Sequence, residues 1–205
     1  GDVYKRQPQD ANENRAGLIG TLVSSDKPIV VNSGSANGSF GNGGARDYGI
    51  DQIVELSKVG KEYIFVKGDG DNSFENVLVV AHDDNTEVSV NGTAVATINA
   101  GYYYIAEGNL YTNDNMYVST SKDVFVYQGI GGTSSEANQG MFFVPPLSCG
   151  SRGDVDNIPL IDRIGDREFD GGITIVTRDG AEVLINNLSI SNQPAGIDVD
   201  GPSTV

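Results

Sequence analysis

Two side chains suited to nucleophilic or acid–base chemistry occur once each in the sequence, His82 and Cys149. A Ser-His-Asp or Cys-His arrangement would need the single histidine as its base. His82 ends a predicted strand beside two aspartates, which favours a surface or capping histidine. Cys149 follows a Pro-Pro loop with only Arg152 as a basic neighbour, which favours an ordinary, partly buried thiol. We therefore expect no catalytic residues.

A loop rich in oxygen ligands, Gly68–Asn76 (GDGDNSFEN), is a candidate metal site. Carboxylate and amide oxygens are the ligands that Ca²⁺ accepts. The spacing departs from the EF-hand loop, which needs a glycine at its sixth position and a glutamate at its twelfth. We expect a solvated loop and no cofactor, with structural calcium as the alternative. The ligands in that alternative are Asp69, Asp71, Asn72 and Glu75.

Other functional motifs carry less information. A catalytic carboxylate pair cannot be distinguished from surface acids in a chain with 28 Asp and Glu residues. No predicted helix follows the glycine-rich stretches, so they do not resemble phosphate-binding loops. Glycosylation sequons begin at Asn37, Asn91 and Asn187, and they matter only in a host that glycosylates. The sequence therefore predicts a protein that is not an enzyme.

The elements that must position these residues follow a repeat. The stretch Ser24–Gly34 (SSDKPIVVNSG) returns as Ser119–Gly129 (STSKDVFVYQG), an offset of 95 residues. A second block, Val79–Asn91, returns as Thr174–Asn186 at the same offset. Separate blocks that match in one register indicate a tandem repeat.

Strand patterns dominate the whole chain. Short alternating or apolar runs lie between glycine-rich turns, and no window of a dozen residues keeps a helical period. We expect an all-β protein of tandem antiparallel β-sandwich-like units with a repeat of about 95 residues, or alternatively propeller-like β-meander blades. The expected parts are a disordered or non-native leader (1–15), a first β unit with a preceding hairpin (16–139), and a second, truncated β unit (140–205).

The clearest hairpin spans Thr86–Ile98, because Asn-Gly at its centre suits a two-residue type I′ turn. This turn sets Val90 opposite Thr93 and Val88 opposite Val95. Side chains alternate across a strand, so the three valines should share one face of the hairpin.

The second unit predicts the same geometry, with Ile185 opposite Leu188 across an Asn-Asn turn. The repeat phase makes Leu18–Ser33 the last hairpin of a unit, as Met116–Gly129 is in the first. The second unit has no counterpart. We expect either a bare edge there or an N-terminal hairpin that closes a sheet with strands of a unit that it does not follow.

Charge and composition exclude several partners. The 205-residue chain carries a formal net charge of −15, which disfavours nucleic acid and anionic membranes. It contains no apolar run of membrane-spanning length, and no signal peptide opens it. A single cysteine forms no internal disulfide, which fits bacterial surface proteins better than small animal ectodomains. The opening GDVYKRQ is unrelated to the repeat, and we expect the chain to be a fragment.

Several segments match a known pattern. They are GT-x-x-SSDKPI-x-V-x-SG, the VEL–GKEYI segment, the hairpin that leads to NAG-YY, and the KDV-VYQ strand. The most specific segment is Tyr127–Cys149 (YQGIGGTSSEANQGMFFVPPLSC). Over about Gly20 to Asn187 the chain resembles the IgGFc-binding protein N-terminal domain family, in the branch carried by large secreted surface proteins of gliding bacteria. The resemblance implies an extracellular, non-enzymatic adhesion or binding role, and it assigns no binding residue.

We therefore expect a non-catalytic binding or adhesion module of a large secreted bacterial surface protein, located outside the cell or at its surface. Its partners would be an extracellular protein or glycan and the remainder of a larger multidomain chain. The alternatives are a passive stalk or spacer repeat and a carbohydrate-active enzyme or its accessory domain. The loops Gly34–Gly49 and Gly131–Gly140 are the expected ligand site, because both follow the repeated strand and neither is built for packing.

Overall fold

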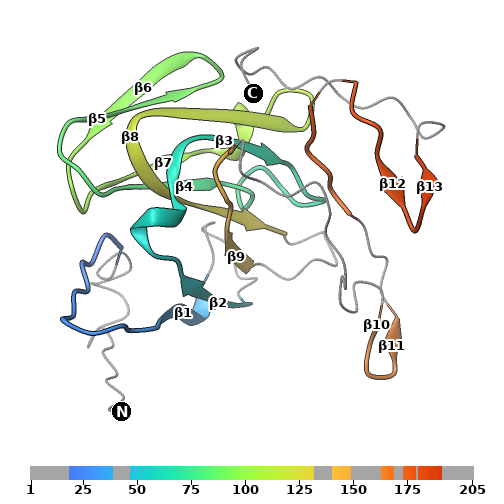
Figure 1. The fold of residues 1–205 in the computed structure, drawn as a ribbon, viewed down its shortest axis with the longest axis horizontal. Coiled ribbons are helices and arrows are strands. Elements are labelled where there is room, and N and C mark those ends of the chain that lie inside the picture. Colours follow the sequence, from blue (N-terminus) through green and yellow to red (C-terminus); the bar gives the residue numbers. More distant parts are fainter. Residues whose placement is uncertain are drawn as a thin grey trace.

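The computed structural model describes residues 19–38, 47–131, 140–148, 163–168, 173–178 and 180–190. Within these ranges the regular structure is β-strand, apart from the short 3-10 helices η1 (Leu56–Lys58) and η2 (Gly108–Leu110) (Figure 1). The predicted all-β fold is confirmed. The expected leader over residues 1–15 lies outside the described residues.

The largest sheet contains seven strands, in the order β6-β5-β8-β4-β7, with β3 and β9 also paired to β8. These strands are β3 (Gly60–Val66), β4 (Val77–Ala81), β5 (Thr86–Val90), β6 (Thr93–Ile98), β7 (Tyr103–Ala106), β8 (Asn115–Ile130) and β9 (Gly140–Phe143). The other described strands form separate antiparallel pairs. They are β1 (Val31–Gly38) with β2 (Asp47–Ile53), β10 (Arg163–Ile164) with β11 (Arg167–Glu168), and β12 (Leu184–Ile185) with β13 (Leu188–Ser189).

The sheet is built on β8, which pairs with four other strands. Around Val118 it lies between β3 and β5, and around Val126 it lies between β4 and β9. Two half-sheets, β6-β5-β8-β3 and β7-β4-β8-β9, therefore share one strand, which curves in Figure 1. A strand that changes partners in this way turns a corner and lets the two halves face each other.

This strand corrects one expectation, because Met116–Gly129 is a single strand and not a hairpin. The polar residues between its two halves, Ser121–Asp123, include no glycine or asparagine to support a tight reversal. Each half also finds neighbours on other strands, so the chain bends there without folding back on itself.

The core lies between the two half-sheets. Alternate residues of β8 point into it, and Met116, Val118, Val124 and Val126 are completely buried. The even spacing from Val118 to Val124 keeps the same face inward across the bend. Strand β3 adds a stacked aromatic pair with ring centroids 6.4 Å apart. The other core residues are Tyr63, Phe65, Val77, Val79, Ala81, Val88, Val90, Ile98 and Ala106.

Both predicted tight hairpins are present. Asn91 and Gly92 have φ of 48° and 78°, the left-handed conformation that a type I′ turn requires, and Val90 is opposite Thr93. In the β12–β13 pair the residues opposite each other are Ile185 and Leu188, as predicted. Local turn chemistry was thus sufficient to place the residues next to each turn.

The β5–β6 register differs from the prediction beyond the turn. Val88 is opposite Ala96 and not Val95, because Ser89 is already opposite Ala94. Val95 is therefore the extra residue of a β-bulge, which turns its side chain away from the core. It is 36% exposed, so the expectation that it shares a face with Val88 is wrong.

The hairpin predicted over Leu18–Ser33 is also wrong. Residues 21–30 form no strand and are exposed, while β1 begins at Val31 and pairs with β2 further along the chain. One local hydrogen bond of the predicted turn is present, in which the N–H of Lys27 donates to Ser25 Oγ at 3.2 Å. A two-stranded hairpin with no described core beneath it is marginal in water, which explains why the turn alone does not form one.

Candidate binding surface

His82 lies where sequence reasoning expected it, exposed in the turn after β4. One of the two aspartates beside it has a structural role, because the Asp84 carboxylate accepts a hydrogen bond from the Ala100 N–H at 3.1 Å. This bond fastens the β4–β5 turn to the segment after β6. Cys149 and Arg152 lie outside the described residues.

Of the three sequon asparagines, Asn91 has a side chain that is hydrogen-bonded to the backbone on both sides. Its Nδ2 donates to the Leu110 carbonyl at 2.8 Å, and its Oδ1 accepts from the Tyr117 N–H at 2.9 Å. Asn187 is exposed, and the side chain of Asn37 lies outside the described residues.

The acidic loop between β3 and β4 is organised by Glu75, whose side chain is fully buried. Its Oε2 accepts a hydrogen bond from the Gly68 N–H at 2.5 Å, and its Oε1 accepts from the N–H groups of Gly70 and Gly131 at 2.6 and 3.2 Å. Hydrogen bonds to an ionised acceptor are the strong ones, and they offset the cost of burying the carboxylate. Both Glu75 oxygens are thus bound to backbone.

The glycines of this loop are required by close approach. A Cβ on Gly70 would lie 1.9 Å from the Gly131 carbonyl oxygen, and one on Gly68 would lie 2.7 Å from Glu75 Oε1. Any side chain at either position would push the loop away from the carboxylate. The repeated glycine before each aspartate of GDGD was the signal that sequence reasoning read only as loop composition.

The four candidate calcium ligands do not converge. Asp69 is exposed, Asp71 is partly buried, and Glu75 points inward to the backbone. Within the described ranges, no three His, Cys, Asp or Glu side chains are close enough to hold a metal ion. Structural calcium stays an untested alternative. The buried hydroxyl of Tyr111 has no hydrogen-bond partner among these residues, and burial followed by the charge of Glu75 raises the Tyr111 pKa.

Of the two expected ligand loops, Gly34–Gly49 and Gly131–Gly140, residues 39–46 and 132–139 lie outside the described residues. The ends of the first are strand and not loop, because residues 34–38 belong to β1 and residues 47–49 to β2. What the structure shows is their setting. The first joins β1 to β2 and the second joins β8 to β9, and both are antiparallel pairs. The two loops therefore have equivalent connections, and a ligand site on them stays a prediction.

An apolar outer face on the half-sheet β7-β4-β8-β9 is the feature that sequence reasoning missed. One row of side chains runs across all four strands, and the next row runs across three. The first row contains Ile105, Leu78, Tyr127 and Phe143, and the second contains Tyr103, Val80 and Phe125. We call these seven residues the apolar face.

The other half-sheet shows what an ordinary outer face looks like here. Across β3, β8 and β5, the residues in one row are Glu62, Ser119 and Ser89. Antiparallel sheets with one solvated side normally alternate in this way, apolar inside and polar outside. The apolar face breaks this pattern, and Tyr103 and Ile105 are each 37% exposed on it. Leu78 and Tyr127 are buried, so the exposed part of the face lies on the edge strand β7, and exposed apolar side chains there mark a candidate interaction site.

One end of the apolar face is fixed by the β1–β2 pair. The Phe143 N–H donates to Asp51 Oδ2 of β2 at 2.6 Å, and the Phe143 ring packs edge-to-face on Tyr127 with centroids 6.0 Å apart. Burial, followed by the charge of Asp51, raises the pKa of Tyr127 to about 12. Tyr127 is therefore neutral at physiological pH and belongs to the apolar surface.

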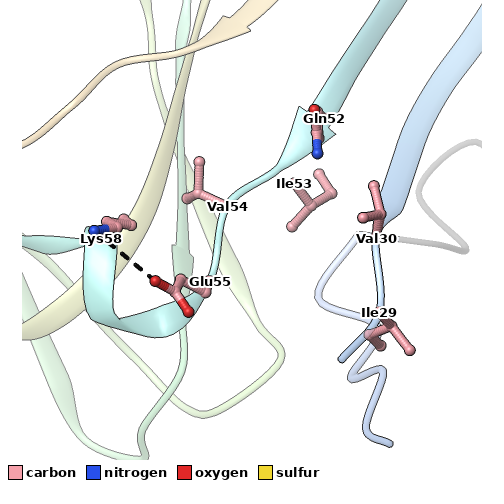
Figure 2. Close-up of a pocket in the computed structure, with 7 residues that line it drawn as sticks. All are labelled: Ile29, Val30, Gln52, Ile53, Val54, Glu55 and Lys58. Carbon is pink, nitrogen blue, oxygen red and sulfur yellow. Dashed lines mark ion pairs between the residues drawn. The ribbon is translucent and has the colours of Figure 1, made fainter. Parts of the chain in front are cut away.

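A shallow depression of about 370 Å³ lies beside the β1–β2 pair. In Figure 2, Val30 and Ile53 approach each other across it, and Lys58 and Glu55 form an ion pair of 3.9 Å at its far side. That pair is exposed and contributes little stability. The lining residues are Ile29, Val30, Gln52, Ile53, Val54, Glu55 and Lys58.

The chain was compared with known proteins. A family model described as IgGFc binding protein matches residues 1–201. No curated protein and no solved structure matches the chain. Among the described residues, no helix has the length and apolar character needed to cross a membrane.

Proposed function

Because the chain belongs to the IgGFc binding protein family, we propose that it is a non-catalytic binding module of a large secreted bacterial surface protein. Its ligand in this proposal is an extracellular protein. The observation that carries the proposal is the apolar face, which presents Tyr103 and Ile105 to solvent, whereas the row Glu62, Ser119 and Ser89 on the other half-sheet is polar.

The composition of this surface fits a protein ligand. Tyrosine and phenylalanine are enriched in protein–protein interfaces, where rigid aromatic rings anchor the contact. The net charge of −15 would steer a basic partner toward the module and would weaken its association at high salt.

Binding of the purified chain to immobilised IgG Fc, and in parallel to an array of extracellular matrix proteins, tests the proposal. Tyr103→Ser and Ile105→Thr should each weaken binding about tenfold, which corresponds to about 1.4 kcal/mol. The matched control is Val95→Thr, because Val95 has nearly the same exposure (36%) on β6, outside the apolar face. Equal binding by all four proteins, or none to any surface, contradicts the proposal.

The alternatives predict different results in the same experiment. A passive stalk or spacer repeat binds no protein on the array, with or without the substitutions. A carbohydrate-active enzyme releases sugars when the purified chain is incubated with glycans, and such release would overturn the non-catalytic assignment.

A further inference from the structure

The pairs β1–β2 and β8–β9 have the same register. With an offset of 95 residues in the first strand and 91 in the second, the opposite residues coincide along the whole β8–β9 pairing. Asn32–Gln52 corresponds to Tyr127–Phe143, and Ser35–Gly49 corresponds to Ile130–Gly140. Strand β1 therefore has the place that the second half of β8 has in the large sheet.

The stretch before β1 corresponds by the same offset to the rest of β8, but its environment differs. Val124 is completely buried beside β4, whereas its counterpart Ile29 is 50% exposed. Val118 is buried beside β5, whereas its counterpart Val23 is exposed. Residues 21–30 thus have the apolar positions of β8 and, among the described residues, no β4-like or β5-like strand beside them.

Near the other end of the described chain are segments that correspond to β4 and to the β5–β6 turn and have no β8-like strand beside them among the described residues. Residues 173–178 correspond to part of β4, and the β12–β13 hairpin corresponds to the β5–β6 turn. Their large apolar side chains are exposed, although Ile185 corresponds to the buried Val90. The exposed members are Ile173, Ile175, Val176, Leu184, Ile185 and Leu188.

We propose that these two parts complete each other between copies, so that residues 173–190 of a second copy of this chain add strands to residues 21–35. The geometry of the large sheet supplies the register. Ala81 is opposite Val124 and Val80 is opposite Phe125. By the offset of 95, Val176 of one copy is opposite Ile29 of the other, and Ile175 is opposite Val30.

A second copy is the occupant because the two parts lie far apart within one chain. Figure 1 shows the segment before β1 at one end of the longest axis and β12–β13 at the other. Pairing between copies joins different surfaces of each molecule and is therefore head-to-tail. The added strands gain main-chain hydrogen bonds and bury exposed side chains, as in strand addition to a sheet edge.

The depression in Figure 2 fits this arrangement. Ile29 and Ile53 line it, and their counterparts Val124 and Val144 belong to the core or pack against it. In the large sheet, β4 pairs with β8 beside Val124 and brings Val79 and Ala81 into the same core. The depression is thus one side of a core whose other side comes from the second copy.

Cysteine cross-linking tests the pairing and its register. One chain carries Ile29→Cys and a second chain carries Val176→Cys, both with Cys149→Ser to remove the native thiol. Opposite side chains in an antiparallel pair are close enough for a disulfide. A linked dimer should form in the mixture, and little should form when Ile29→Cys is mixed with Ile173→Cys, which is three positions out of register.

Absence of the in-register product, or equal yields from both mixtures, overturns the proposal. A chain that carries both Ile29→Cys and Val176→Cys and links only within itself also overturns it, because the second copy would then be unnecessary. All the substituted positions are exposed or lie outside the described residues, and circular dichroism confirms that each variant is folded.

Sedimentation gives an independent readout. The wild-type chain should form head-to-tail oligomers as its concentration rises, and Val30→Asp and Ile175→Asp should each weaken association at least tenfold. Val95→Asp is the control, since Val95 is exposed on β6 and outside both parts. A wild-type chain that stays monomeric at all concentrations contradicts the proposal, and so does equal weakening by the control. Binding to Fc or matrix proteins does not enter either experiment, so this inference and the proposed function fail separately.

Discussion

Replacement of Glu75 by glutamine isolates the effect of the buried carboxylate, because the two side chains have nearly the same shape. The amide oxygen of glutamine can still accept hydrogen bonds from Gly70 and Gly131. Its NH₂ group, however, would face the N–H of Gly68, and two donors cannot bond to each other. Glu75→Gln should therefore loosen the loop between β3 and β4 while it leaves the apolar core intact.

The magnitude follows from the three hydrogen bonds. Two of them change from charged to neutral acceptors, which costs about 1 kcal/mol each, and the unpaired Gly68 N–H costs about 1–3 kcal/mol. Glutamine carries no charge, so its burial costs less free energy, which offsets part of this destabilisation. We expect the free energy of unfolding to fall by about 2–4 kcal/mol.

Urea denaturation followed by circular dichroism measures this free energy, with Glu87→Gln as the matched control. Glu87 is exposed on β5, so its replacement should change stability by less than about 0.5 kcal/mol. A change of that small size for Glu75→Gln would refute the reasoning. So would a fall in the melting temperature of the wild-type protein on chelation of calcium that matches the effect of Glu75→Gln, because Glu75 would then be a metal ligand.

Three further predictions use other parts of the structure. Gly70→Ala should destabilise the protein by more than about 2 kcal/mol in the same urea assay, because the new Cβ would lie 1.9 Å from the Gly131 carbonyl oxygen; wild-type stability would contradict the packing of the loop. Burial raises the pKa of Tyr63 to about 12, so the stability that the neutral hydroxyl contributes is present below pH 10 and is lost as the pH rises from about 10 to about 12. Urea titrations across that range should show that the free energy of unfolding falls less steeply with pH in Tyr63→Phe than in the wild type. Equal slopes would exclude Tyr63 as a cause of the fall. Deletion of residues 38–44 should leave folding intact, because shortening a loop changes its closure entropy little, and should weaken attachment of the parent protein to its target; unchanged attachment favours a stalk.

Local chemistry was predictable from sequence. Asn91-Gly92 and Asn186-Asn187 tolerate the positive φ that a tight turn requires and adopt it here, so both turns and the residues beside them were placed correctly. The bulge at Val95 was not predictable, since Thr-Ala-Val-Ala-Thr carries no signal for an extra residue. Alternation in β8 showed that it is a strand, but its bend depends on partners that are distant in sequence.

The surface features were harder to predict for a related reason. The run Val77–Val80 is apolar at every position, so its pattern does not show which face meets the core and which forms the apolar face. Glu75 looked like any other acid in an acidic loop, because its burial depends on Gly131 far along the chain. Loop composition predicted oxygen ligands and could not show that backbone N–H groups bind the Glu75 carboxylate.

The central place of β8 determines when the sheet can form during synthesis. Strand β3 is paired only with β8 among the described strands, and the Tyr63 hydroxyl donates to the Val124 carbonyl 61 positions later at 2.6 Å. Strands β3 to β7 therefore leave the ribosome before the strand that joins them. A nascent chain that ends before Val124 contains the core residues of β3 to β7 but lacks Val124 and Val126 of β8, which complete the core. Sheets closed by such distant contacts fold in milliseconds to seconds, and until β8 arrives the earlier strands present open edges that a chaperone or an export factor can hold.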